Sequence, residues 1–248
     1  MSAPRSVAII PARAKSKRIP AKNVKLFCGE PMIAYPIKAA KDAGVFERIV
    51  VSTDDQQIAD IAKAFGAEVP FMRPLELADD FTGTNAVVLH ALRELREQGA
   101  QFDLVCCIYA TAAFVRPSSL RDGHRILLHG EATSAFSVGA YPHPVQRAFR
   151  VNEEGCLAWM HPEFKEARSQ DLPASFFDAG QFYWAKVKSF VETGTFLTET
   201  TRPIELPRWL THDIDTSVDW EYAEILYEVL AKRGKFGQAG RGALGSQT

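Results

Sequence analysis

Short apolar runs alternate with helical patterns along most of the chain, and this alternation is the strongest constraint on the fold. The apolar runs have the length of buried strands and fall at residues 7–11, 49–53, 68–71, 104–109 and 133–138. The helical patterns cover residues 32–40, 56–65, 85–98 and 117–129. Parallel strands need a crossover between them, which is usually a helix. The alternation therefore predicts an α/β fold with a mostly parallel sheet and helices on both faces.

The alternation breaks down between residues 141 and 180, where prolines interrupt the pattern and residues 156–160 are typical of a hairpin. We interpret this segment as an arm inserted into a single domain of residues 1–233 and as a candidate dimerisation element; a surface loop region is the alternative. The elements expected after it are a strand at 181–185, a helix at 186–192, an extended segment at 203–206 and a helix at 219–232. Residues 234–248 are rich in glycine and poor in large apolar side chains, so we expect them to be disordered.

The composition indicates a cytoplasmic protein without a membrane-spanning helix. A chain of 248 residues fits one α/β domain with a small appendage. It has no apolar run of about 18 residues, and its N-terminus lacks the pattern of a secretory leader. The four cysteines show no metal-binding spacing, and two of them are adjacent within an apolar run. They are typical of small core residues in a reducing compartment.

Positive charge is concentrated directly after the first expected strand. Seven Lys or Arg residues precede Glu30, the first acidic residue, although the formal net charge of the chain is -1. Because open α/β sheets bind ligands beyond the carboxyl ends of their strands, the loop carrying Arg13, Lys15 and Lys22 is a candidate polyphosphate site. It contains no glycine and no Gly-Lys-Ser/Thr, which excludes a Walker loop and a dinucleotide fingerprint. The alternative is a solvated basic terminus that binds nucleic acid or nothing, which the interrupting apolar and proline residues disfavour.

Two aspartates near the C-terminus complement the basic loop. In an extended segment, residues i and i+2 point to the same side, so Asp213 and Asp215 would form a pair while Ile214 packs inward. Two carboxylates, with phosphate oxygens from a substrate, are a common way to hold Mg²⁺. A surface turn with a helix cap is the alternative reading of this triplet. Asp54 and Asp55 form a second acidic site, in which we expect Asp55 to cap the helix at 56–65.

Several motifs together resemble a known family. Those of the basic loop are Pro11-Ala12-Arg13, Ser16-Lys17, Pro20 and Lys22-Asn23, and those after it are Val51-Ser52-Thr53-Asp54-Asp55, Arg73-Pro74, Asp79-Asp80 with Thr84, and Asp213-Ile214-Asp215-Thr216. In this order they resemble the CMP-sugar synthetases, the cytidylyltransferases for nonulosonic (sialic-acid-like) sugars. The resemblance covers roughly residues 6–232 and is strongest to the branch acting on pseudaminic acid. The segments that indicate this branch include Phe27-Cys28-Gly29, Arg168-Ser169-Gln170-Asp171 and Asp178-Ala179-Gly180-Gln181-Phe182-Tyr183-Trp184.

The resemblance implies a single nucleotidyltransferase domain with the Rossmann-like nucleotide-diphospho-sugar transferase fold. It also implies Mg²⁺ dependence and a homodimer whose arm completes the partner's sugar site. By position, the nucleotide-binding residues would be Ala12, Arg13, Ser16, Lys22, Asn23 and Arg73, with Arg73 on the cytosine edge. The sugar-binding residues would be Tyr109, Thr111, Arg168, Gln170 and Gln181, and the metal ligands Asp213 and Asp215. Arg13, Lys22 and Asp215 would be the catalytic residues.

Three places depart from the pattern of relatives, and one of them is the Asp178-Ala179-Gly180 segment, which stands where relatives often have Asn-Gly. Lys15 stands where many relatives have glycine, so the distance at which the loop backbone can approach the phosphates would differ from that in those relatives. Tyr109 stands where sialic acid synthetases carry Gln, which favours a differently substituted sugar over N-acetylneuraminic acid. No histidine is an obvious general base, and we expect His212, beside the aspartate pair, to be structural.

The reaction implied by the resemblance is CTP + pseudaminic acid → CMP-pseudaminic acid + diphosphate, with no nucleic-acid or membrane partner. The first alternative is CMP-activation of sialic, legionaminic or 3-deoxy-octulosonic acid. The second is a GT-A-like glycosyltransferase. That class carries its Asp-x-Asp pair mid-chain, whereas the pair of this chain stands near the C-terminus, which disfavours the assignment. The third is a non-catalytic nucleotide-binding regulator, which the presence of Lys22, Asp213 and Asp215 disfavours.

Overall fold

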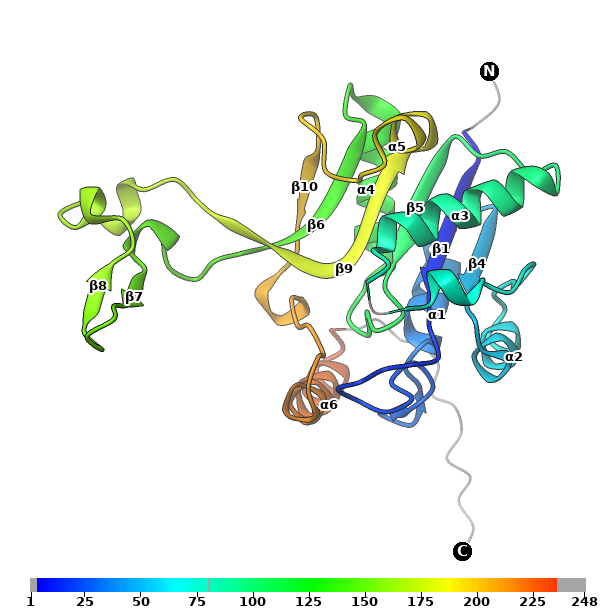
Figure 1. Ribbon diagram of the computed structural model, residues 1–248, viewed down its shortest axis with the longest axis horizontal. Helices are drawn as coiled ribbons and strands as arrows, with labels where there is room; N and C mark the ends of the chain where they lie inside the picture. Colours follow the sequence, from blue (N-terminus) through cyan, green and yellow to red (C-terminus); the bar gives the residue numbers. More distant parts are fainter. Residues whose placement is uncertain (1–3, 80, 236–248) are drawn as a thin grey trace, which may run out of the picture.

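A six-stranded sheet forms the centre of the computed structural model, which describes residues 4–79 and 81–235 (Figure 1). Its strands are β1 (Ser6–Pro11), β4 (Arg48–Ser52), β5 (Leu104–Ile108), β6 (Ser134–Ala140), β9 (Phe176–Lys186) and β10 (Arg202–Glu205). They lie in the order β10-β6-β9-β5-β1-β4. Strand β1 is parallel to β4 and β5, and β10 is parallel to β6, whereas β9 is antiparallel to both of its neighbours. The predicted mostly parallel sheet is confirmed, with β9 as its exception.

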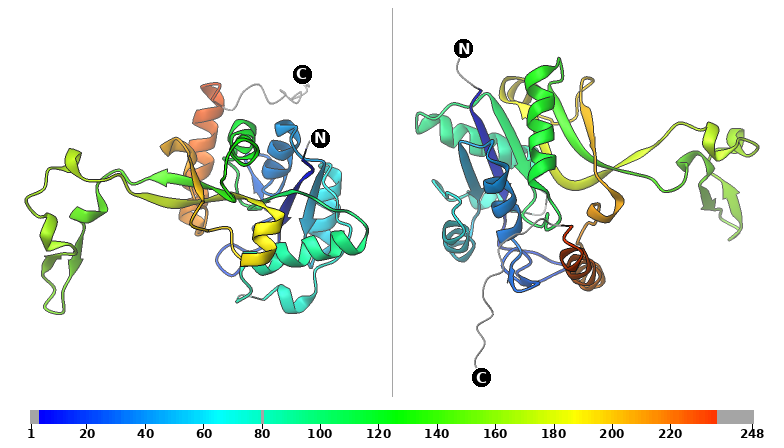
Figure 2. Two further views of the ribbon diagram at one scale, coloured as in Figure 1. Left: turned by 90° about the horizontal axis from the view of Figure 1, so that it is seen from above. Right: turned by 180° about the vertical axis from the view of Figure 1, so that it is seen from behind.

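Helices cover both faces of the sheet, as predicted (Figure 2). They are α1 (Ala34–Ala43), α2 (Gln56–Ala64), α3 (Thr84–Glu97), α4 (Pro117–His129), α5 (Val187–Thr193) and α6 (Ser217–Lys232). Alternate residues of β1 enter the two cores. Ala8 and Ile10 join the cluster that contains residues of α1 and α4, whereas Val7 and Ile9 join that of α3 and α5. Burial on both faces explains why this strand is apolar throughout.

Local signals fix several helix ends. The Asp55 carboxylate accepts a hydrogen bond of 2.9 Å from the Ile58 N–H and caps α2, which confirms that prediction. Helix α1 ends at Gly44, whose φ of 65° lies in the left-handed region that glycine favours. Helix α6 begins with a capping box, in which the side chains of Thr216 and Asp219 bond to each other's backbone N–H groups.

Some local predictions differ from the structure. Residues 68–71 form no full strand, because only Glu68 makes an isolated parallel bridge, to Val50. A small hairpin of β2 (Leu26–Phe27) and β3 (Glu30–Pro31) precedes α1 and was not predicted. Pro31 belongs to β3, and the helix predicted from residue 32 begins only at Ala34. Pro36 lies in the first turn of α1, where a missing N–H costs no intrahelical hydrogen bond.

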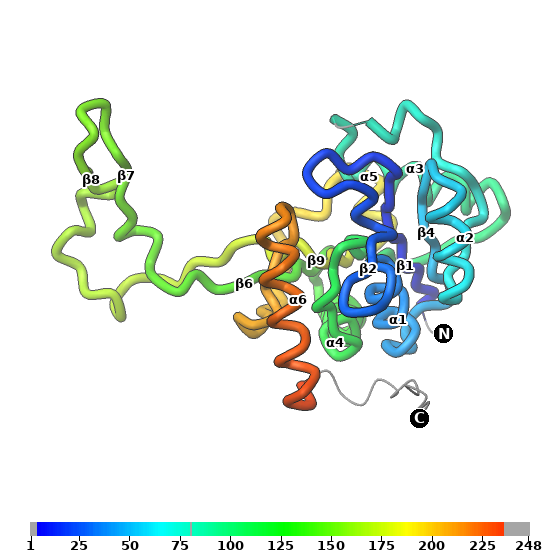
Figure 3. The backbone as a smooth tube through the Cα atoms, turned by 90° about the horizontal axis from the view of Figure 1, so that it is seen from below, coloured from blue at the N-terminus to red at the C-terminus, as the bar shows by residue number. Residues whose placement is uncertain are grey.

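The segment between β6 and β9 projects from the body of the molecule as an arm (Figures 1 and 3). Its outer part is an antiparallel hairpin of β7 (Phe149–Val151) and β8 (Leu157–Trp159). Phe149, Val151 and Leu157 expose 51%, 66% and 73% of their surface, which is high for large apolar side chains. The C-terminal boundary of the predicted arm, residue 180, is wrong, because β9 of the central sheet already begins at Phe176. Its role in dimerisation stays a prediction.

The last described residue is Lys235, just after α6. The prediction that residues 234–248 are disordered thus falls, from residue 236 onward, outside the described residues. Helix α6 buries Trp220, Ala223 and Leu230 against the rest of the protein. Every helix within the described ranges is too short or too polar to cross a lipid bilayer.

Candidate active site

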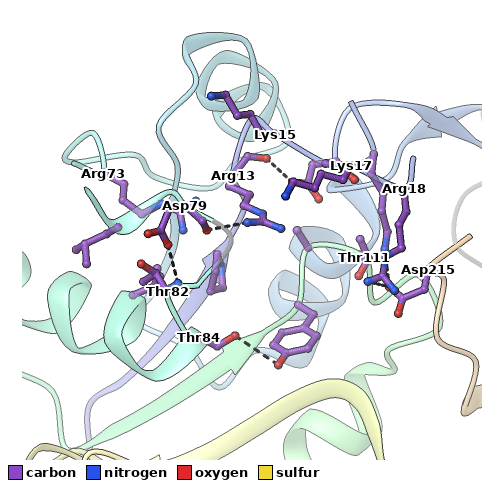
Figure 4. A pocket seen from close by; sticks show the side chains of 18 residues that line it. Arg13, Lys15, Lys17, Arg18, Arg73, Asp79, Thr82, Thr84, Thr111 and Asp215 are labelled. Atoms are coloured by element: carbon purple, nitrogen blue, oxygen red, sulfur yellow. Dashed lines mark hydrogen bonds and ion pairs between the residues drawn. The ribbon is translucent and has the colours of Figure 1, made fainter. Parts of the chain in front are cut away.

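A cleft of about 680 Å³ opens where β1, β4 and β5 end, at their carboxyl edge (Figure 4). Of the residues predicted to bind substrate, those that line it are Arg13, Ser16, Lys22, Asn23, Arg73, Tyr109, Thr111 and Asp215. Such a volume is ordinary for a small-molecule site. The Arg73 side chain stands at one end and Asp215 at the other, with Arg13 between them.

The basic loop and the C-terminal aspartate meet across this cleft. The Lys22 Nζ lies 3.5 Å from the Asp215 Oδ1, and the Arg18 Nη2 lies 2.8 Å from the same oxygen. Lys22 is largely buried, with 13% of its side chain exposed, whereas Arg18 is mostly exposed. The predicted convergence of the two ends of the chain is thus present in the structure.

The Asp213-Ile214-Asp215 segment has the predicted alternation. Ile214 is fully buried, while Asp213 and Asp215 remain accessible. The pKa of Asp213 is raised, first because packed protein removes part of its hydration and second because the negative charge of Asp215 is near; Lys22 and Arg18 offset part of this rise. Asp215 lines the cleft and Asp213 does not. Two neighbouring carboxylates that repel each other are a suitable donor set for a divalent cation. No cluster of three or more metal-binding side chains exists among residues 4–79 and 81–235.

Arg73 forms the most buried polar part of the cleft. It is 5% exposed, and its Nη2 lies 3.7 Å from the Asp54 Oδ1, an ion pair too long for a hydrogen bond. The Nε and Nη2 atoms of Arg73 have no hydrogen-bond partner in the protein. Burial lowers the pKa of Arg73, and Asp54 offsets part of that effect. Buried donors without partners are costly, so they indicate a group that a ligand satisfies.

Hydrogen bonds from neighbouring loops hold Arg13 and the start of the basic loop. The Arg13 Nη1 donates to the Asp79 backbone carbonyl at 2.7 Å, and the Asn23 side-chain amide donates to the Arg13 carbonyl at 2.9 Å. The Ala14 N–H donates to the Asp54 Oδ1 at 2.9 Å. The Asp79 carboxylate accepts from the Thr82 hydroxyl and N–H groups, which lowers the pKa of Asp79. The loop is therefore fixed before a ligand arrives.

Lys15 fits its position without backbone strain. Among the described residues other than glycine, only Ala21 and Cys28 have a positive φ, so the Lys15 backbone is in an ordinary region. Its side chain is exposed and lies at the rim of the cleft. Glycine is therefore not required here by conformation, and lysine adds a positive charge to the cleft.

Five of the predicted residues do not line the cleft, and one of them is Asp213, which lies beside Asp215. Ala12 is buried and donates its N–H to the Ser52 carbonyl at 2.9 Å, so this donor is already used. Gln181 is also buried, and its amide donates to the Leu210 carbonyl just before the aspartate pair. Arg168 and Gln170 lie on the projecting arm, where the Arg168 Nε bonds to the Asp171 carboxylate at 2.6 Å. One chain therefore does not bring these arm residues to its own cleft.

His212 has a structural place, as expected. Its Nε2 lies 3.1 Å from the Asp219 carbonyl, and its ring packs against Phe114 and Tyr222. It does not line the cleft.

Sequence reasoning missed the contribution of Asp54, which joins Arg73 to the basic loop. The available signal was its position at the end of β4, at the same sheet edge as the end of β1. It also missed the Arg18–Asp215 pair, for which the sequence holds no local signal.

Comparisons with known proteins cover nearly the whole chain. A family model described as Cytidylyltransferase matches residues 7–153. The chain is 38% identical over 225 residues to a pseudaminic acid cytidylyltransferase of Campylobacter jejuni, with 91% of this chain and 97% of that protein covered. It is 35% identical over 231 residues to the CMP-N,N'-diacetyllegionaminic acid synthase of Legionella pneumophila, with the same two coverages. A solved structure of CMP:2-keto-3-deoxy-manno-octonic acid synthetase complexed with CTP shares the fold, with a TM-score of 0.64 at 17% identity over 91% of this chain and 99% of that one.

Proposed function

The chain belongs to the cytidylyltransferase family, and from this premise we propose that it catalyses CTP + pseudaminic acid → CMP-pseudaminic acid + diphosphate. One observation of the structure carries the proposal. The basic loop with Lys22 meets Asp215 across a cleft whose far end holds the unpartnered donors of Arg73. The cleft would thus supply cations for a triphosphate, a carboxylate for a metal and a buried donor fork for a base.

Arg73 is the proposed contact for the cytosine edge. Its planar guanidinium presents fixed donors, and cytosine offers the acceptors O2 and N3 on one edge. The Nε and Nη2 atoms that lack partners in the protein would be satisfied there. The Nη2 atom also lies 3.7 Å from the Asp54 Oδ1, whose negative charge holds the guanidinium near the end of β4. The phosphates would then extend along the basic loop, past Arg13 and Ser16 toward Lys22, with Asn23 at the nucleotide.

In the proposed reaction the anomeric hydroxyl of the sugar attacks the α-phosphorus of CTP. The new bond joins the anomeric oxygen to phosphorus, the bond to the bridging oxygen breaks, and diphosphate leaves with the electron pair. The hydroxyl proton is lost to solvent or to a phosphate oxygen. Such a transfer needs alignment and charge neutralisation more than covalent help. Arg13 and Lys22 would neutralise negative charge on the phosphates as the bond to diphosphate breaks.

Asp213 and Asp215 are the proposed Mg²⁺ ligands. The raised pKa of Asp213 reflects in part its repulsion by Asp215, which a cation would relieve. When bound, the metal would act as a Lewis acid on phosphate oxygens. Arg18 and Lys22 contact the Asp215 carboxylate and line the same cleft, so they would add positive charge beside the bound phosphates.

The sugar would lie near Tyr109 and Thr111, which line the same cleft. We further propose a homodimer in which the arm of a second copy supplies Arg168 to the sugar carboxylate and Gln170 beside it. Exposed apolar side chains on the arm hairpin support an interface there. Gln181 would contribute by holding the backbone before the aspartate pair rather than by touching the sugar. We assign the protein to the cytoplasm, which agrees with four unpaired cysteines.

The test is diphosphate release with CTP, Mg²⁺ and each of four acids: pseudaminic, legionaminic, N-acetylneuraminic and 3-deoxy-manno-octulosonic. We expect release with pseudaminic acid, formation of its CMP conjugate by mass spectrometry, and no release when ATP replaces CTP. Efficient turnover of another acid in preference would replace the sugar assignment. Absence of release with every acid, despite CTP binding, would overturn the enzymatic proposal in favour of a nucleotide-binding regulator.

A further inference from the structure

The carboxylate of Asp54 continues the pairing of β1 and β4 beyond the end of β4. In the parallel ladder Pro11 lies opposite Ser52, and the Ala12 N–H donates to the Ser52 carbonyl at 2.9 Å. The next bond of such a ladder would join the Ala14 N–H to the Asp54 carbonyl. The Ala14 N–H donates to the Asp54 Oδ1 instead, at 2.9 Å, because the chain leaves the sheet here to begin α2. The Asp54 side chain therefore fixes the start of the basic loop.

The same carboxylate oxygen faces Arg73. The Asp54 Oδ1 lies 3.7 Å from the Arg73 Nη2, and the two side chains are only 8% and 3% exposed. The Arg73 N–H donates to the Thr53 carbonyl at 2.7 Å, so residues 53 and 54 hold both the backbone and the side chain of Arg73. Within residues 4–79 and 81–235, no other carboxylate forms an ion pair with Arg73. One oxygen of Asp54 thus serves both the guanidinium and the basic loop.

These two neighbours require different properties of Asp54. The Ala14 N–H needs an acceptor oxygen, which a neutral amide could also supply. The buried Arg73 guanidinium needs a negative charge, because a charge that is out of water and unpaired is costly. Only an ionised carboxylate meets both needs. The adjacent Asp55 meets neither, since its carboxylate caps α2.

We infer that Asp54 is a positioning residue that couples recognition of the base to binding of the phosphates. Its negative charge holds the Arg73 guanidinium for the base edge, and its acceptor oxygen holds the loop backbone at Ala14 for the triphosphate. The inference rests on the proposed function, which places cytosine at Arg73 and the phosphates along the basic loop. It adds that one side chain outside the reaction controls both, and that the two roles can be separated by substitution.

The test measures dissociation constants for CTP, UTP and inorganic tripolyphosphate by calorimetry, with Mg²⁺ and without sugar. Uracil has a donor at N3 where cytosine has an acceptor, so the ratio of the UTP Kd to the CTP Kd reports on Arg73. Tripolyphosphate has no base and reports on the basic loop. Asp54→Asn should lower the ratio about tenfold and leave the tripolyphosphate Kd unchanged. Asp54→Ala should lower the ratio equally and also raise the tripolyphosphate Kd roughly fivefold, because Ala14 loses its acceptor.

Asp55→Asn is the matched control, since it removes the same charge one residue further on and keeps an acceptor for the cap of α2. Both readouts should stay at their wild-type values. Thermal unfolding shows whether each variant is folded. A purely structural role for Asp54 would weaken the binding of all three ligands by one common factor and would leave the ratio unchanged.

Combination with Arg73→Ala tests whether the charge of Asp54 acts through Arg73. Asp54→Asn should then cause no further loss of the ratio beyond that of Arg73→Ala alone. These double variants contain no unpaired Arg73 charge, so they keep the test valid if Asp54→Asn alone fails to fold. Arg73→Ala with Asp54→Asn should bind tripolyphosphate about fivefold more tightly than Arg73→Ala with Asp54→Ala.

Three results would each overturn the inference. They are an unchanged ratio in folded Asp54→Asn, equal tripolyphosphate Kd values for the Asn and Ala variants, and a further loss of the ratio when Asp54→Asn is added to Arg73→Ala. Failure of the proposed function would be distinct, because wild type itself would then release no diphosphate from CTP with any of the four acids.

Discussion

The Arg73 end of the cleft and the Tyr109 end differ in how much of each is built by one chain. Around Arg73, one chain supplies every group: Asp54 accepts a hydrogen bond from the basic loop at Ala14 and forms an ion pair of 3.7 Å with the buried guanidinium. At the Tyr109 end, the cation proposed for the sugar carboxylate, Arg168, lies on an arm that projects away from the cleft. The difference teaches that the nucleotide end of the cleft is preorganised within one chain, whereas the sugar end would be completed only in the proposed homodimer.

The comparison predicts that the largest effect comes from the point where both halves meet, the Asp215 carboxylate. Asp215→Ala should lower kcat by about a hundredfold or more, because a metal-assisted step loses several kcal/mol of charge stabilisation. The fold should survive, since the side chain is partly exposed and its ion pairs lie at the cleft. Steady-state diphosphate release and circular dichroism check this. Near-normal turnover of this variant would contradict a role for Asp215 in the reaction. It would also contradict the idea that the nucleotide and sugar ends of the cleft meet at this carboxylate.

A second prediction tests whether the nucleotide half acts alone. Arg73→Ala should raise the KM for CTP by roughly 10- to 100-fold, because hydrogen bonds from a charged donor are lost in a buried site. The KM for sugar should change little. Arg73→Lys is the matched control: it keeps the charge but not the fork of donors, and should recover only part of the affinity. Equal changes in both KM values would contradict the division of the cleft.

The third prediction tests whether the sugar half needs a partner. Arg168→Ala should raise the sugar KM by about tenfold and leave the KM for CTP unchanged, because a charged contact to the carboxylate is lost. Mixing this variant with Asp215→Ala should restore a normal sugar KM, since each Arg168→Ala subunit keeps its own Asp215 and receives an intact arm. An arm that acts on its own chain would give no restoration. Arg147→Ala, on the same arm, is a control for loss of charge.

The two halves also differ in how well the sequence predicts them. Arg13, Lys22 and Asp215 stand next to strand ends or in short motifs, and the structure brings all three to the cleft. The Asp54–Arg73 pair and the Arg18–Asp215 pair join segments that no local pattern relates. The antiparallel direction of β9 was missed for the same reason. The apolar pattern of the sequence indicates that a strand is present, but only its pairing with neighbouring strands gives its direction.

The burial of the Gln181 side chain is another feature that the sequence did not predict. Gln181 belongs to a motif shared with relatives, which suggested a sugar contact, yet its side chain is enclosed and bonded to Leu210. A side chain on a strand points to one of two faces, and the register decides which. The register of β9 comes from its pairing with β5 and β6, which sequence reasoning did not have.

The smallest predicted effect concerns Asp219, which holds the junction of the two halves in place. Its Oδ2 accepts from the N–H groups of Asp215 and Thr216 at 3.1 and 2.7 Å, and these bonds, led by those from Thr216, lower the pKa of Asp219. Loss of such a cap in Asp219→Ala should reduce the free energy of unfolding by about 1 kcal/mol at pH 7. Asp219→Asn, which keeps one acceptor oxygen, should lose less.

The pH dependence of this effect has a definite sign. Because the pKa of Asp219 is lower in the folded protein, the stabilisation is complete above the unfolded value of about 3.9 and is lost as pH falls through the folded pKa. Urea unfolding of wild type and Asp219→Ala between pH 7 and pH 3 should therefore give curves that converge on acidification. A difference that is absent at pH 7, or that grows as pH falls, would show that Asp215 is positioned by other contacts. The junction would then owe its geometry to the ion pairs with Arg18 and Lys22 rather than to the helix cap.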